Sequence, residues 1–260
     1  MCELLALSAN VPTDICFSFT GLMQRGGMTG PHKDGWGIGL YEGKACRLFH
    51  DPHPSAWSKV AALIQDYSIK SHISIAHIRK ANRGRVCLAN THPFARELWG
   101  TTWVFAHNGQ LRGIKQRQLK HYQPVGTTDS EYAFCWIMDQ IRKKYSRRPK
   151  NENTLYRFIQ DMAVDIDELG VFNFMLSDSR QLYVYCSNRM CWLTRRHPFG
   201  KARLIDTGKV VDFRKLTTPR DIVSIIASRE LTDNETWNNM RKKELVIFRD
   251  GQTIEFNQTR

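Results

Sequence analysis

Residues 1–8 of the chain read Met-Cys-Glu-Leu-Leu-Ala-Leu-Ser. The apolar run within residues 3–8 predicts a buried strand that begins directly after Cys2. A side chain as small as that of Cys at position 2 normally allows Met1 to be removed. We therefore expect the mature chain to start at Cys2, immediately before a strand of the core.

A chain that starts at Cys2 carries a thiol and a free α-amino group on one residue. The amine titrates at about 7.7–8.0 and the thiol at about 8.5, so both groups exchange protons near neutral pH. An N-terminal nucleophile whose own amine acts as the base is a known form of covalent catalyst. The alternative is that Cys2 has no chemical role and only precedes the strand.

Apolar periodicity predicts the other elements in three groups along the chain. The first group has helices at residues 14–23 and 55–67, a hairpin of strands 36–41 and 44–49, and strands at 73–78 and 103–107. Two longer helices follow at 129–145 and 153–169. The last third is rich in strands, at residues 171–177, 182–186, 191–194, 221–227, 245–249 and 253–256.

This order of strands, helices and strands predicts an α+β fold layered from antiparallel sheets. At 260 residues and 42% hydrophobic, the chain can bury a large core. We interpret residues 1–260 as a single domain, with residues 146–152 as the only candidate boundary.

Composition narrows the cellular setting. No apolar run approaches the ~18–20 residues of a membrane-spanning helix, and residues 1–30 lack the pattern of a secretory signal. The seven cysteines include no Cys-x-x-Cys pair, which argues against a zinc ribbon or a disulfide scaffold. We expect a cytoplasmic protein with reduced thiols and no contact with membranes.

The net charge of +13 raises the question of an acidic partner or nucleic acid. Basic residues cluster in two segments, 112–120 and 142–150. No zinc finger, aromatic RNA-binding motif or Gly-x-x-Gly clamp accompanies them. We therefore favour solvated surface charge over nucleic-acid binding.

Three polar motifs lie where predicted elements begin or end. Arg79 follows an apolar strand, where a guanidinium can hold a carboxylate through two hydrogen bonds, although surface arginines are common in a basic protein. Asn108 and Gly109 offer a side-chain amide and a backbone N–H suited to an oxyanion, although Asn-Gly is also a common hairpin turn. Asp129 precedes a helix, where its carboxylate could bind an ammonium group or the segment could serve as a helix cap.

Two further features have structural interpretations. The glycines within residues 33–39, Lys-Asp-Gly-Trp-Gly-Ile-Gly, let the backbone pass close to a bulky group, and they do not form a phosphate-binding loop. The nine histidines show no metal-ligand spacing, so we expect no metal site. We interpret His77, His92 and His107 as hydrogen-bonded structural residues near a pocket.

Taken in order, five motifs of this chain resemble those of the class II glutamine amidotransferases. They are Cys2 and the segments 34–39, 77–79, 107–109 and 128–131. The remainder of the chain resembles the short, stand-alone members of that family. The resemblance implies an αββα four-layer sandwich, with two antiparallel sheets between layers of helices, which is the fold of N-terminal-nucleophile hydrolases.

The resemblance also implies roles for individual residues. Cys2 corresponds to the nucleophile, and its α-amine to the proton carrier. Asn108 and Gly109 correspond to the oxyanion hole. Arg79 corresponds to the residue that binds the α-carboxylate of glutamine, and Asp129 to the one that binds the α-ammonium group.

The chain departs from the larger family after Arg79. Lys80 and Asn82 stand where a Trp and a Thr are usual, which puts the substrate contacts of Asn82 in question and bears on which γ-glutamyl amide fits. Trp36 and His32 border the expected pocket and are candidate lid residues, with Trp36 a candidate substrate contact.

The implied reaction is hydrolysis of the γ-amide of glutamine through a thioester on Cys2, without a metal or organic cofactor. The ammonia could pass to a separate synthase subunit. Alternatively, the protein could hydrolyse a γ-glutamyl amide or peptide bond in a small metabolite. A third interpretation is an inactive basic scaffold or RNA-binding protein, which the retention of Cys2, Arg79, Asn108 and Asp129 disfavours.

Overall fold

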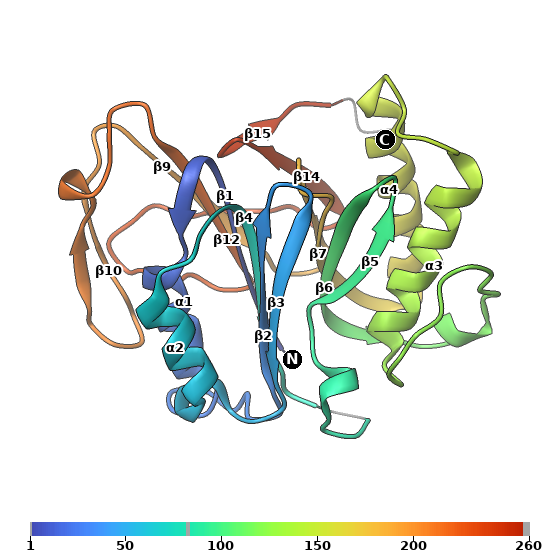
Figure 1. Cartoon of the computed structure of the whole chain (residues 1–260), viewed down its shortest axis with the longest axis horizontal. Helices are drawn as coiled ribbons and strands as arrows, with labels where there is room; N and C mark the ends of the chain where they lie inside the picture. The colour runs from blue at the N-terminus through green and yellow to red at the C-terminus, as the bar shows by residue number, and fades with distance from the viewer. Residues whose placement is uncertain (1, 82–83, 257–260) are drawn as a thin grey trace.

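The computed structural model describes residues 2–81 and 84–256, which form two stacked β-sheets with helices on both outer faces (Figure 1). Every strand pair is antiparallel. The fold is therefore a four-layer αββα sandwich, which confirms the α+β class and the layering expected from the sequence.

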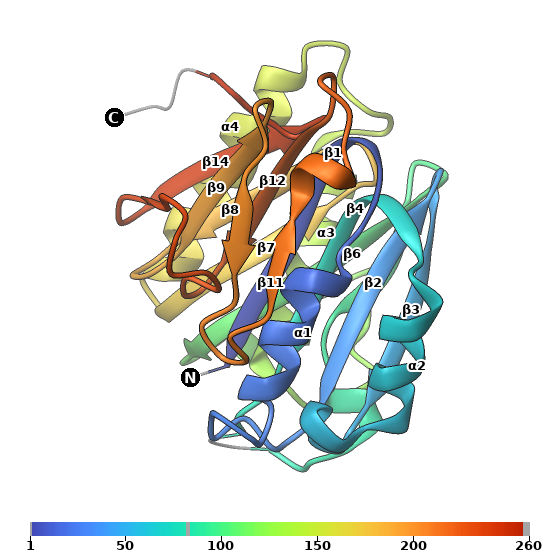
Figure 2. The ribbon, with the colours of Figure 1, turned by 90° about the vertical axis from the view of Figure 1, so that its left-hand side faces the viewer.

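The first sheet has seven described strands in the order β13-β9-β12-β1-β4-β2-β3. Their bounds are β1 (Glu3–Asp14), β2 (Trp36–Glu42), β3 (Ala45–Asp51), β4 (Lys70–Ile78), β9 (Cys191–Arg196), β12 (Ile222–Ala227) and β13 (Asn238–Asn239). The helices α1 (Cys16–Arg25) and α2 (Lys59–Tyr67) cover its outer face, and the 3-10 turn η1 (Ser55–Trp57) precedes α2 (Figure 2). Strand β1 lies inside this sheet, between β12 and β4.

The second sheet has six described strands in the order β15-β14-β8-β7-β6-β5. They are β5 (Phe94–Leu98), β6 (Thr101–Leu111), β7 (Gly170–Ser177), β8 (Leu182–Cys186), β14 (Glu244–Arg249) and β15 (Gln252–Ile254). The helices α3 (Asp129–Lys144) and α4 (Glu152–Asp167) cover this sheet (Figure 1). The short strands β10 (Lys201–Arg203) and β11 (Val210–Asp212) pair separately, and further 3-10 turns are η2 (Leu88–Asn90), η3 (Ile114–Gln116) and η4 (Phe213–Lys215).

The alternation of side chains along β1 explains why helices and a second sheet can both pack against it. Leu5 and Leu7 point to one face and join the core shared with α1 and α2. Leu4 and Ala6 point to the other face and join the core between the two sheets. Both faces of β1 are buried because successive residues of a strand point in opposite directions. This central strand therefore holds Cys2 at a fixed place in the sandwich.

Most predicted elements are confirmed, with two informative differences. Strand β1 continues to Asp14 and α1 begins at Cys16, because residues beyond an irregularity after Ser8 pair again with the start of β4. Strand β5 was not predicted from the sequence, because two of its five residues are Arg96 and Glu97 and its burial does not alternate. None of the described helices is both long enough and apolar enough to cross a lipid bilayer.

Candidate active site

The pairing of β1 with β4 determines the surroundings of Cys2. Glu3 is opposite Ile78 in this ladder, so Cys2 lies beside the residues that follow β4. The Lys80 N–H donates to the Cys2 sulfur (3.4 Å), and the thiol lies 3.6 Å from the Lys80 carbonyl oxygen. The thiol is therefore held against the main chain at the point where the strand ends.

Glu3 fixes the same end of β1 through two arginines. Its buried carboxylate pairs with Arg25 (2.8 Å) and Arg229 (3.0 Å). Arg25 also pairs with Asp206 (2.7 Å). Because buried charges are costly unless paired and hydrogen-bonded, this network favours one position for the residue next to Cys2.

Cys2 opens into a cavity of about 250 Å³ between the two sheets and the start of α3. Segments far apart in the sequence meet there, including those that carry Cys2, Arg79, Gly109 and Asp129. The cavity is lined by Cys2, Arg79, Lys80, Ala81, Gly84, His92, His107, Gly109, Gln110, Leu111, Lys115, Thr127, Thr128, Asp129 and Ser130.

Burial raises the pKa of the Cys2 thiol, and the charge of Asp34 raises it further. The hydrogen bond from Lys80 and the positive charges of the chain's amino end and Arg79 act in the opposite direction. The net effect is an increase, so the resting thiol is protonated at neutral pH. A reaction that begins with thiolate attack at this site therefore needs a nearby proton acceptor.

Arg79 is buried, with 3% of its surface exposed. Its Nη1 donates to the Arg85 carbonyl oxygen (3.2 Å), and its backbone N–H donates to the Gly35 carbonyl oxygen (2.8 Å). Among the described residues no carboxylate forms an ion pair with it. A buried guanidinium without an acidic partner is unfavourable unless an anion arrives, so this side chain is suited to bind a substrate carboxylate.

Asp129 begins α3 on the other side of the cavity. The cap of this helix is Thr128, whose hydroxyl accepts the Glu131 N–H (3.1 Å). The Asp129 carboxylate accepts the Leu111 N–H (2.7 Å) and the Ser130 N–H (3.0 Å). Each carboxylate oxygen can accept further hydrogen bonds, so Asp129 is held in place and still able to bind a cation. Capping and cation binding can thus use different residues of the same turn.

Asn108 and Gly109 lie on β6, opposite Asn173 and Phe172 of β7. Gly109 lines the cavity, and a Cβ at this position would lie 1.7 Å from the Val171 carbonyl oxygen, so only glycine fits. Asn108 is 5% exposed, and its Oδ1 has no hydrogen-bond partner among the described residues. A buried amide oxygen without a partner is uncommon in a folded protein. This atom only accepts hydrogen bonds, so a donor role of Asn108 would belong to its Nδ2 group.

Asn90 was not singled out from the sequence, yet it joins the two loops that carry Arg79 and Asp129. Its Nδ2 donates to the Arg85 carbonyl oxygen (2.9 Å), and its Oδ1 accepts the Thr127 N–H (2.7 Å). Asn90 is 1% exposed. The only sequence signal was its position in a polar loop, which does not reveal such a contact.

Two predicted lid residues need correction. Trp36 is fully buried in the core beneath α1, with its ring 5.7 Å from that of Phe19, and it is not part of the cavity wall. The prediction that Trp36 contacts the substrate is wrong, because Trp36, Ile38 and Leu40 all point to the helix side of β2. His32 is also buried, near the Arg25 carbonyl oxygen (3.2 Å). Asn82 lies outside the described residues.

Three buried histidines lie at the cavity, two of which, His92 and His107, line it. His107 contacts the Ser130 hydroxyl (2.8 Å) and the Val171 carbonyl oxygen (3.0 Å), which confirms its expected hydrogen bonding. The rings of His77 and His92 are 4.2 Å apart. The nitrogens of His92 have no hydrogen-bond partner among the described residues, so the expected hydrogen bonding is wrong for His92. No three potential ligand side chains in the described part of the chain gather into a metal site.

Acidification is expected to destabilise the protein through these histidines. Burial lowers the pKa of His77, His92 and His107, so all three are neutral in the folded state at pH 7. Below the ordinary value of about 6.5, the unfolded chain binds protons that the folded chain excludes, and stability falls with pH. The loss grows between pH 7 and pH 5, and His77 and His92 contribute most because their pKa values are lowered furthest.

Urea unfolding at a series of pH values measures this effect. His92→Phe, which keeps a ring of similar size, should flatten the dependence on pH. His121→Phe is the matched control, because it removes a histidine that is exposed rather than buried. A slope that is the same in all three proteins would show that His92 does not contribute.

Comparison with known proteins gives a consistent result. Residues 1–260 match the family model described as class II glutamine amidotransferases. A protein of Escherichia coli (strain K12) named "Putative glutamine amidotransferase YafJ" is 55% identical over 98% of this chain and 100% of its own length. A "predicted glutamine amidotransferase" from Pseudomonas aeruginosa is 45% identical, with a TM-score of 0.76, over 98% of this chain and 100% of that one.

A more distant structure shares the fold. The glutamine phosphoribosylpyrophosphate amidotransferase from B. subtilis aligns with a TM-score of 0.63 at 15% identity. The alignment covers 99% of this chain and 50% of that one. At this identity the likeness concerns the arrangement of helices and strands.

Proposed function

The chain belongs to the class II glutamine amidotransferases, and we propose that it hydrolyses the side-chain amide of glutamine with Cys2 as the nucleophile. One observation carries the proposal. Arg79, buried without an acidic partner, and the Asp129 carboxylate line the same small cavity as the Cys2 thiol. An α-amino acid presents a carboxylate and an ammonium group, which these two side chains complement.

The proposed reaction begins when the Cys2 sulfur bonds to the amide carbon of glutamine. The thiol proton moves to the α-amine of Cys2, which becomes available once Met1 has been removed. The amine then protonates the departing nitrogen, the C–N bond breaks and ammonia leaves. Water attacks the resulting thioester, the C–S bond breaks, and glutamate and the free thiol are formed.

Asn108 and Gly109 are the proposed donors to the negatively charged oxygen of each tetrahedral intermediate. Both lie on β6, which pairs with β7 over residues 104–111, so the main chain that carries the proposed donors is fixed by the sheet. Preorganised donors of this kind stabilise the transition state more than the substrate.

The size of the cavity favours glutamine over larger γ-glutamyl compounds. Its volume of about 250 Å³ is below the range of about 300–1,000 Å³ that is typical of pockets for drug-sized ligands. A γ-glutamyl peptide would have to extend past Lys80 and Lys115 into solvent. Purified protein tested with glutamine and with γ-glutamyl dipeptides distinguishes the two substrates when the formation of glutamate is measured, because glutamate is the product of both reactions. Only glutamine should be hydrolysed efficiently.

Asp129→Asn is expected to remove the preference for substrates that carry an α-ammonium group over substrates that lack it. Loss of the charge should lower kcat/KM for glutamine by about 10–10³-fold, as for other hydrogen-bonded charge pairs. The activity on 4-carbamoylbutanoate, which is glutamine without its amino group, should change little. Steady-state ammonia release measured with both substrates gives the ratio of their kcat/KM values in the parent and in the variant.

The control for Asp129→Asn is the melting temperature of the variant, because Asp129 also accepts two backbone N–H groups. If activity fell equally on both substrates, the residue would be structural, and the proposed contact with the ammonium group would be wrong.

A further inference from the structure

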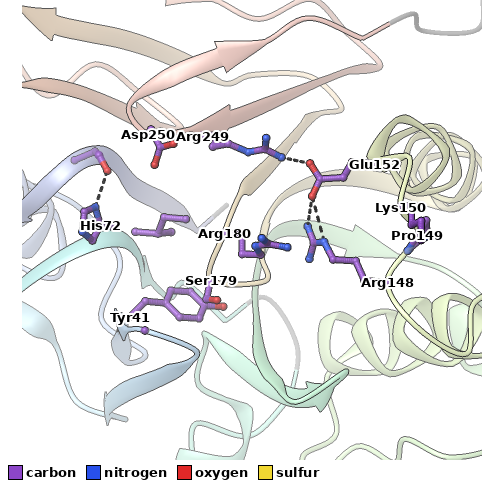
Figure 3. A pocket seen from close by; sticks show the side chains of 13 residues that line it. Tyr41, His72, Arg148, Pro149, Lys150, Glu152, Ser179, Arg180, Arg249 and Asp250 are labelled. Carbon is purple, nitrogen blue, oxygen red and sulfur yellow. Dashed lines mark hydrogen bonds and ion pairs between the residues drawn. The ribbon is translucent and has the colours of Figure 1, made fainter.

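A second cavity, of about 750 Å³, is shown in Figure 3, and Cys2 is not among its lining residues. It is lined by residues near the start of β4, such as His72 and Ile73, whereas the candidate active site follows the end of that strand at Ile78. At about 3.3 Å per strand residue, six residues separate the two sites by roughly 20 Å. The second cavity is therefore a separate site.

The floor of this cavity is apolar and its wall is cationic. Ala9, Tyr41 and Ile73 from the first sheet form the floor. The wall is formed by four positively charged side chains from three segments, which are Arg148, Lys150, Arg180 and Arg249. A surface of this kind is suited to a ligand with an apolar or ring-shaped body and an anionic group.

Two of the four cations are already arranged around a carboxylate. Arg148 contacts Glu152 Oε1 through its Nη2 (3.1 Å) and Nε (3.2 Å), and Arg249 pairs with the other oxygen of Glu152. Figure 3 shows both guanidinium groups at the Glu152 carboxylate. Arg148 also pairs with the buried Asp178. These contacts fix the two arginines and show that the wall accommodates anionic oxygens.

The other two cations are not neutralised in this way. Neither Lys150 nor Arg180 has an ion-pair partner among the described residues, and both are exposed at the cavity. The remaining acid of the lining, Asp250, is exposed in the turn between β14 and β15. The first turn of α4 adjoins the site and adds positive potential.

We propose that this cavity binds the phosphate monoester of a small metabolite, of the size of a sugar phosphate or a mononucleotide. Lys150 and Arg180 contact the phosphate, while the rest of the ligand packs on the floor formed by Ala9, Tyr41 and Ile73. A phosphate monoester carries a charge of about −1.5 to −2 and three acceptor oxygens, which match two free cations better than a single carboxylate does. This inference is independent of the proposed glutaminase activity.

Calorimetric titration tests the proposal with two matched pairs of probes, glucose 6-phosphate against glucose and AMP against adenosine. We expect at least one phosphate to bind with a Kd below about 100 μM, and neither uncharged partner to bind. The double variant Lys150→Gln/Arg180→Gln should weaken binding at least tenfold. Arg241→Gln/Lys242→Gln removes the same charge from exposed residues beyond the other end of β14 and should bind as the parent does.

Three results would overturn the proposal. Equal weakening in both double variants would indicate a general effect of net charge. Succinate binding as tightly as the phosphates would show that the site recognises carboxylates. Competition between the phosphate and saturating glutamine in the Cys2→Ala variant would place the ligand in the other cavity. Ammonia release is not needed for any of these measurements, so failure here is distinguishable from failure of the proposed function.

Discussion

The Cys2→Ala variant is expected to release ammonia from glutamine at least about a thousandfold more slowly than the parent protein. Cys2 is the only cysteine among the residues described as lining the cavity, so no second thiol can replace it. The remaining binding groups, Arg79 and Asp129, stay in place. We therefore expect the loss in kcat, with little change in the affinity for glutamine. Glutamate formation under saturating substrate measures it.

Cys16→Ala is the matched control, because Cys16 is also a partly exposed thiol near the amino end of the chain. It lies at the start of α1 and does not line the cavity, so its removal should leave the rate unchanged. If Cys2→Ala retained the parental rate, the proposed thioester would be excluded. If both variants lost activity, a general effect on folding would explain the result.

The same mechanism links activity to the removal of Met1. An amide bond to Met1 would occupy the nitrogen that the mechanism uses as a base. We expect the rate to follow the fraction of molecules that start at Cys2, as measured by intact mass in preparations with and without methionine aminopeptidase treatment. Full activity in molecules that retain Met1 would show that another group accepts the thiol proton.

The sequence predicted the layers well because each layer follows from local patterns. Residues 4–7 form a continuous apolar run, which is typical of a strand with both faces buried, and Leu4 and Leu5 indeed belong to separate cores. The periodicity of α3 and α4 fixed their ends to within two residues. Strand β5 was missed because its pairing with β6 overrides a local sequence with few strand signals.

The site was predicted in part, for a different reason. Arg79, Gly109 and Asp129 each adjoin the end of an element, and ends of neighbouring elements meet at one edge of the sandwich. Trp36 was misplaced because the face of β2 to which it belongs depends on register, and a shift of one residue exchanges the two faces. Asn90 and the wall of the second cavity depend on contacts between distant segments, about which local pattern says nothing.

Asn108→Ala is expected to lower kcat for glutamine hydrolysis by about 10²–10³-fold, the usual cost of losing one oxyanion donor. The main-chain carbonyl oxygen of Asn108 accepts a hydrogen bond from the Asn173 side chain (3.2 Å). The substitution preserves this carbonyl group. Its side-chain Oδ1 has no partner in the described part of the fold, so removal of the amide breaks no contact of that atom. Stability should therefore change far less than the rate.

The comparison of kcat, KM and melting temperature separates the two possible roles of Asn108. A donor that acts on the developing oxyanion affects kcat and leaves KM almost unchanged, because the charge is absent from bound glutamine. Asn173→Ala is the structural control, because the Asn173 side chain accepts the N–H groups of Ser187 (3.0 Å) and Asn188 (3.1 Å). This variant should lose stability before it loses rate per folded molecule. A parallel loss of stability and activity in Asn108→Ala would assign this amide to the fold and leave Gly109 as the oxyanion donor on β6.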